Sequence, residues 1–127
     1  DKKINVNNIV DPSKITIGYE CGYKTDRNHI AQLIKNLIRS PHKRITHNWA
    51  PAYDYCLLAS GKIEAVITDP GTEIYDFGAG KLIALEAGAK ITNLVGKKNS
   101  NYLDDKFILS NSNKIKNFVL SVIKKAK

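Results

Sequence analysis

The stretch YDFGAGKLIALEAG, residues 75–88, decides how the rest of the chain is interpreted. It predicts a helix from about Asp76 to Ala87, and Gly88 is the residue type that commonly follows the last turn of a helix. Residues 69–71, Asp-Pro-Gly, predict a turn just before it, and residues 63–68 predict a strand before the turn. A strand that leads through a tight turn into a helix is the repeating unit of an α/β fold.

The same alternation continues on both sides of this stretch. Residues 15–20 alternate apolar and polar side chains, as a strand does, and residues 30–38 carry an apolar helical stripe. Strands are predicted at residues 15–20, 44–46, 63–68, 90–95 and 106–109, and helices at residues 30–38, 51–60, 76–87 and from 111 onward. We therefore expect one α/β domain over residues 15–127, a sheet with helices on both sides. Residues 1–14 are polar and are expected to be a leader or a remnant of a missing part.

The composition is that of an ordinary globular domain. Of the 127 residues, 43% are hydrophobic and 25% charged, and no apolar run approaches the roughly 20 residues that span a bilayer. No secretory signal precedes the domain, so a cytoplasmic location is expected. The chain begins with Asp and contains no Met, and we therefore expect a longer parent protein.

The net charge of +8 raises the question of a polyanionic partner. The basic residues are dispersed, however, and aromatic residues are not interleaved with them in a stacking pattern. The sequence therefore argues against nucleic-acid binding. Cys21 and Cys56 lie in apolar surroundings and are predicted to be reduced and buried, and His29, His42 and His47 are predicted to be surface or loop residues.

Two helix starts carry the candidate functional residues. Asp76 follows the predicted turn, where a carboxylate is either a helix cap or a ligand for a hard cation such as Mg²⁺, and both interpretations stay open. Ala50, Pro51 and Ala52 begin the preceding helix, whose free N–H groups either bind an anion or simply start the helix. Asp54, one turn further on, is predicted to offset the helix dipole.

Two segments together resemble the inositol monophosphatase-like enzymes. Residues 50–65, APAYDYCLLASGKIEA, are similar to the helix-then-strand signature of that family, and residues 75–89 are similar to its second signature, which contains a Trp-Asp pair. The resemblance covers roughly residues 15–125 and implies a mixed sheet that forms the C-terminal half of a layered αβαβα phosphatase. It also implies Mg²⁺-dependent hydrolysis of a small phosphomonoester, with Asp76 as a metal ligand.

The resemblance further implies substrate contacts, which we assign to Ala50, Pro51, Ala52, Thr68 and Arg44. Trp49-Ala50 replaces the Gly-Ser start of the first signature, and Tyr75 replaces the tryptophan of the second. Thr68 stands where the family often has a glutamate that contacts a polyol hydroxyl. Tyr75-Asp76 is closer to the histidinol-phosphatase branch, so the substrate stays open among inositol phosphate, histidinol phosphate, and sugar or nucleotide bisphosphates.

The family's remaining metal ligands belong to a D-P-x-D-G-T-like motif and an upstream glutamate in the N-terminal half. Here Asp11-Pro12 is followed by Ser13-Lys14. We therefore place no catalytic residue in this chain and expect it to be inactive without the missing N-terminal half. A homodimer is the implied assembly. The alternative is a non-catalytic binding module or a degenerate relative.

Overall fold

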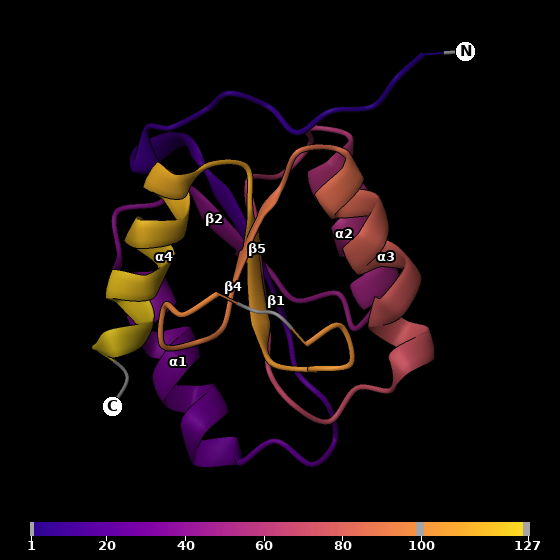
Figure 1. Ribbon diagram of the computed structural model, residues 1–127. Coiled ribbons are helices and arrows are strands. Elements are labelled where there is room, and N and C mark those ends of the chain that lie inside the picture. Colours follow the sequence, from indigo (N-terminus) through magenta and orange to yellow (C-terminus); the bar gives the residue numbers. More distant parts are fainter. Residues whose placement is uncertain (1, 99–100, 126–127) are drawn as a thin grey trace.

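A five-stranded mixed sheet forms the centre of the protein (Figure 1). The computed structural model describes residues 2–98 and 101–125. The strands are β1 (Thr16–Glu20), β2 (Arg44–Thr46), β3 (Ala65–Thr68), β4 (Lys90–Thr92) and β5 (Phe107–Ser110). Their order is β2-β1-β3-β5-β4; β1 runs parallel to β2 and β3, and β5 runs antiparallel to β3 and β4.

Helices cover both faces of this sheet, as the sequence predicts. They are α1 (Arg27–Arg39), α2 (Pro51–Ala59), α3 (Ile74–Glu86) and α4 (Asn113–Lys124), and a short 3₁₀ helix, η1 (Pro12–Lys14), precedes β1. Figure 1 shows α1 and α4 on one side of the sheet and α2 and α3 on the other. The fold therefore has three layers.

Each helical layer encloses its own apolar core against the sheet. Leu33 of α1 and Val119 of α4 pack with Ile17 of β1 in one core, and Tyr55 of α2 packs with Val66 of β3 in the other. A fully buried aliphatic or aromatic side chain contributes about 1.5–3 kcal/mol of transfer free energy. The two cores thus fix the sheet between the helix pairs.

Several element ends differ from the expected ones because of local hydrogen bonds. α1 begins at Arg27, since Asp26 accepts a hydrogen bond from the Asn28 N–H (2.9 Å) and caps the helix. β4 ends at Thr92, because the side chain of Asn93 accepts the N–H groups of two following residues and closes a turn. The prediction that both cysteines are buried is wrong for Cys56, which is exposed.

The N-terminal segment packs against the edge of the domain opposite to the carboxyl ends of β1 and β3. The Asn7 Nδ2 atom donates to the Gly61 carbonyl (3.0 Å) and to Glu64 Oε1 (2.8 Å), and Asn111 Nδ2 donates to Asn7 Oδ1 (2.8 Å). Its assignment as a leader or remnant stays a prediction.

α2 and α3 together leave several apolar side chains exposed to solvent. Tyr53, Leu82 and Ile83 are exposed there, although a surface helix normally turns a polar face to water. A helix that is apolar on both sides is typical of a position between two layers. Within the described residues, no helix combines the length and apolarity needed to cross a membrane.

Candidate metal and substrate site

The candidate site lies where β1 and β3 end and where α2 and α3 begin. β1 leads into α1 on one face of the sheet and β3 leads into α3 on the other, and ligands of open α/β sheets bind in the crevice at such a divergence. The Gly22 N–H donates to the Pro70 carbonyl (3.3 Å). A Cβ atom on Gly22 would lie 2.1 Å from the Gly71 carbonyl oxygen, so the two loops touch only because Gly22 has no side chain.

A pocket of about 410 Å³ opens beside these loops, and we call it the Asp76 pocket. Its charged lining residues are Glu20, Lys24, Glu73 and Asp76. A concave site with a few convergent polar groups is the usual setting for binding a small molecule.

Asp76 occupies the first turn of α3, as expected, but it is not the N-cap residue. The helix begins at Ile74, so Glu73 is the N-cap, and Asp76 Oδ2 accepts the Glu73 N–H (3.1 Å). The other carboxylate oxygen, Oδ1, makes no hydrogen bond within the part of the chain that the structure describes. Capping and metal binding are therefore compatible roles for this one side chain.

The start of α2 contributes one residue directly to the pocket. Pro51 lines it, whereas Ala50 is half-buried, Ala52 is exposed, and neither is a lining residue. No side chain caps this helix, because Ala50 has no side-chain acceptor. Its first turn therefore has N–H groups without a side-chain cap beside the pocket, and Asp54 in the same turn offsets part of their charge.

The structure does not bring Thr68 and Arg44 to this pocket. The side chain of Thr68 is fully buried in β3, where its hydroxyl is 2.8 Å from the Tyr55 hydroxyl. Arg44 is exposed at the first position of β2 and pairs in register with Thr16, at the amino end of the parallel strands. The pocket lies at the other end.

Trp49, just before α2, has a left-handed backbone with φ of 55°. It is the one residue other than glycine with positive φ among those described, and this conformation costs a residue with a Cβ atom about 1–2 kcal/mol. The glycine that the family signature has here would avoid that cost. The exposed indole lines the Asp76 pocket and contacts Tyr23, with ring centroids 5.0 Å apart.

A buried pair of carboxyl groups lies beneath the pocket. Glu20 at the end of β1 is 1% exposed and Asp54 of α2 is fully buried. Burial, together with the hydrogen bond and charge of Asp54, raises the pKa of Glu20 to about 8. This shift favours the protonated form of Glu20 at neutral pH. Asp54 lies in the first turn of α2, as predicted, and its carboxylate also accepts a hydrogen bond from Asn48 Nδ2 (2.9 Å).

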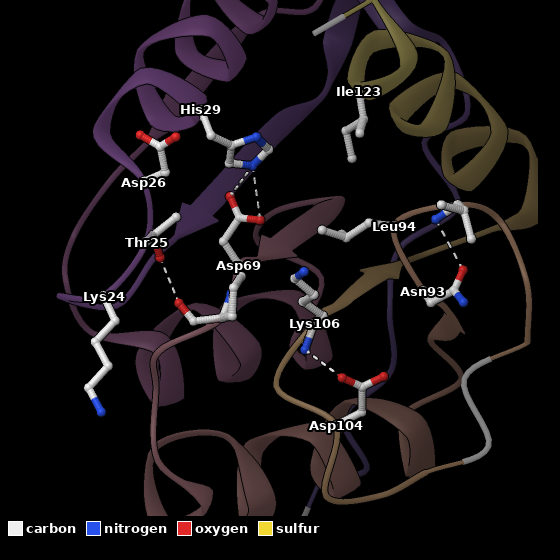
Figure 2. A pocket seen from close by; sticks show the side chains of 12 residues that line it. Lys24, Thr25, Asp26, His29, Asp69, Asn93, Leu94, Asp104, Lys106 and Ile123 are labelled. Carbon is white, nitrogen blue, oxygen red and sulfur yellow. Dashed lines mark hydrogen bonds and ion pairs between the residues drawn. The ribbon is translucent and has the colours of Figure 1, made fainter. Parts of the chain in front are cut away.

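A second pocket, of about 480 Å³, lies on the other side of Asp69 and is shown in Figure 2. In it the Asp69 carboxylate is held by His29 Nε2 (3.1 and 3.2 Å) and by the Tyr19 hydroxyl (2.5 Å). Leu94 and Ile123 supply apolar walls. Lys24, Asp26, Asp104 and Lys106 also line this pocket, whereas its buried carboxylate, Asp69, already has two partners.

The sequence analysis missed Glu20, Asp69 and the role of His29. Glu20 looked like the polar position of a strand, and Asp69 looked like a turn residue. His29 is in the first turn of α1 and not in a loop. The acidic residues at the carboxyl ends of two parallel strands, Glu20 as the last residue of β1 and Asp69 directly after β3, are the signal that could have indicated a cluster of carboxylates at this edge.

The metal requirement can be tested against the side chains present. Mg²⁺ prefers oxygen ligands and is usually bound by one or two carboxylates together with phosphate oxygens and water. Among residues 2–98 and 101–125, no group of three or more His, Cys, Asp or Glu side chains could hold a metal ion. A metal ion bound by Asp76 would therefore need further ligands from outside these residues.

Comparison with known proteins gives the same family that the two sequence signatures resemble. A family model described as the inositol monophosphatase family matches residues 2–127. No curated protein matches the chain.

Solved structures with the same fold include an IMPase from Thermotoga maritima (TM-score 0.82, 21% identity, covering 98% of this chain and 46% of that one). They also include SuhB from Mycobacterium tuberculosis (TM-score 0.74, 22% identity, covering 98% of this chain and 46% of that one). A third is the extragenic suppressor protein SuhB from Bartonella henselae (TM-score 0.84, 20% identity, covering 98% of this chain and 48% of that one). The chain thus spans about half the length of these structures.

Proposed function

The chain belongs to the inositol monophosphatase family, and we propose on this premise that it is the C-terminal part of a Mg²⁺-dependent phosphatase. Its substrate is a small phosphomonoester. The observation that carries the proposal is the position of Asp76, which lines a pocket at the start of α3 with one carboxylate oxygen unengaged by the described residues.

In this proposal, Asp76 contributes one ligand to the metal. A bound Mg²⁺ polarises the phosphoryl group and activates the attacking water. The chain's own contribution is to bind and orient the ester: the uncapped start of α2 and the ammonium group of Lys24 attract the phosphate. The touching glycines, Gly22 and Gly71, bring two backbone loops to the pocket edge without side chains in the way.

The remaining metal ligands come, in this proposal, from the N-terminal half of the same protein. The apolar outer surface of α2 and α3 supports this, because exposed Tyr53, Leu82 and Ile83 are what a covering layer would bury. The matched structures are about twice as long as this chain. The proposal includes a homodimer and a cytoplasmic location, which rest on the family resemblance and on the sequence alone.

The test is a phosphate-release screen on the full-length protein with inositol, histidinol, sugar and nucleotide phosphates, with and without Mg²⁺. We expect Mg²⁺-dependent release from at least one ester and none from residues 1–127 alone. Failure of the full-length protein to release phosphate from any ester would favour the alternative, a non-catalytic binding module or a degenerate relative.

A further inference from the structure

Three exposed aromatic side chains gather at the Asp76 pocket. Tyr23, Trp49 and Tyr75 are 86%, 63% and 80% exposed, and all three line it. They come from three separate parts of the chain: the loop after β1, the loop before α2 and the first turn of α3. Aromatic side chains normally bury most of their large surface, so three exposed rings at one pocket indicate a binding surface.

The backbone of Trp49 strengthens this interpretation. Its φ of 55° is a conformation that favours glycine, yet the sequence places the largest side chain there. Strained backbone of this kind persists mainly where function requires it. The tilted contact with Tyr23, with an angle of 52° between the ring planes, holds the indole at the pocket.

Charged side chains and exposed aromatic rings therefore line the same pocket. A ligand whose phosphate lies between the metal proposed at Asp76 and the start of α2 has its alcohol part within a pocket of about 410 Å³ that these rings border. Flat unsaturated rings stack on tyrosine and tryptophan faces. A polyol gains little from such a wall, because each hydroxyl that leaves water needs a hydrogen-bond partner.

We propose that the rings of Tyr23, Trp49 and Tyr75 select phosphomonoesters whose alcohol part carries a flat heteroaromatic ring over polyol phosphates. This proposal rests on the proposed phosphatase function for the placement of the phosphate. Within the substrates left open by the sequence, it favours imidazole- or nucleobase-bearing esters over inositol and sugar phosphates.

The test measures binding without turnover. The full-length protein is titrated calorimetrically, in Mg²⁺, with the methylenephosphonate analogues of adenosine 5′-monophosphate and of glycerol phosphate, in which CH₂ replaces the ester oxygen. We expect the adenosine analogue to bind at least about tenfold more tightly, which corresponds to about 1.4 kcal/mol.

Two variants and one control locate the effect. Trp49→Gly removes a ring and relieves the backbone, Tyr23→Leu keeps an apolar side chain without a ring, and each should reduce the preference to within about twofold. Ile38→Ala removes an exposed apolar side chain of α1 that does not line the pocket and should leave the preference unchanged. Equal affinities in the wild type, or an unchanged preference in both ring variants, would overturn the proposal.

The outcome is separable from that of the proposed function. Release of phosphate from glycerol phosphate together with equal analogue affinities would contradict the ring selection and leave the phosphatase intact. Tight, Trp49-dependent binding of the adenosine analogue without phosphate release from any ester would support the ring selection and contradict the phosphatase.

Discussion

The carboxyl groups of Glu20 and Asp54 face each other inside the protein, beneath Gly18. Glu20 Oε1 and Asp54 Oδ2 are buried and have no hydrogen-bond partner among the described residues. A Cβ atom on Gly18 would lie 2.7 Å from Asp54 Oδ2, so the glycine leaves room for Asp54. Burial and the neighbouring Asp54 both raise the pKa of Glu20 and so favour its protonated form.

The first prediction concerns the pH dependence of stability. Glu20 has a pKa of about 8 in the folded protein against 4.5 for the free side chain, so the folded state holds a proton that the unfolded state has released. The contribution of this pair is fully present below about pH 4.5 and is lost as the pH rises through 8, by up to about 1.4 kcal/mol per pH unit. Glu20→Gln, which mimics the protonated form, should remove this loss.

Urea unfolding at pH 5.5 and at pH 8 checks this. The stability of Glu20→Gln relative to the wild type should increase between the two pH values. Glu73→Gln, which changes an exposed acid lining the same pocket, is the control and should follow the wild type. Parallel stability curves for wild type and Glu20→Gln would show that the folded state does not keep Glu20 protonated.

The second prediction concerns Asp76 as a metal ligand. Asp76→Asn keeps an oxygen that can accept the Glu73 N–H but removes the charge that Mg²⁺ needs. We expect Mg²⁺-dependent phosphate release by the full-length protein to fall more than about 100-fold, with little change in its urea midpoint. Asp26→Asn is a matched control, because Asp26 also accepts a helix-start N–H but lies outside the Asp76 pocket. Unchanged turnover of Asp76→Asn at limiting Mg²⁺ would refute the assignment.

The sequence predicts the layers of this protein better than its site. The strands and helices follow local patterns, such as the alternation before Glu20 and the apolar stripe of α1, and local patterns need no knowledge of the partner element. The Glu20–Asp54 pair and the Tyr19–Asp69–His29 group depend on which strands are neighbours and in which register. A local sequence pattern does not show which strands are neighbours or in which register they pair. Each of these carboxylates therefore looked like an ordinary position in a strand, helix or turn.

The third prediction separates the backbone strain of Trp49 from its ring. Trp49→Gly should raise the free energy of unfolding by up to about 1 kcal/mol, because glycine adopts φ of 55° without a Cβ clash. Trp49→Ala also removes the ring but keeps the Cβ atom, so it should give no such gain. Denaturant unfolding of both variants measures the difference. Equal stabilities for the two would mean that the left-handed conformation costs nothing here.

The fourth prediction concerns Lys81, whose ammonium group is buried next to β5. Its Nζ atom donates to the Asp104 carbonyl (3.1 Å) and the Tyr102 carbonyl (3.3 Å), and it lies 4.2 Å from the ring centroid of Phe107. Lys81→Met keeps a side chain of similar length. It leaves the two carbonyl acceptors without this donor and removes the cation–π contact with Phe107. Each lost contribution is about 1–3 kcal/mol, so we expect a destabilisation of about 2–4 kcal/mol.

Hydrogen exchange distinguishes this role from simple loss of packing. In Lys81→Met the amides of the loop from 101 to 104 should exchange faster than those of α2, because the ammonium group ties that loop to α3. Lys35→Met, an exposed position in the middle of α1, is the matched control and should change stability by less than about 0.5 kcal/mol. A destabilised Lys81→Met protein with uniform exchange across loop and helix would show that the ammonium group fills space but does not hold the loop.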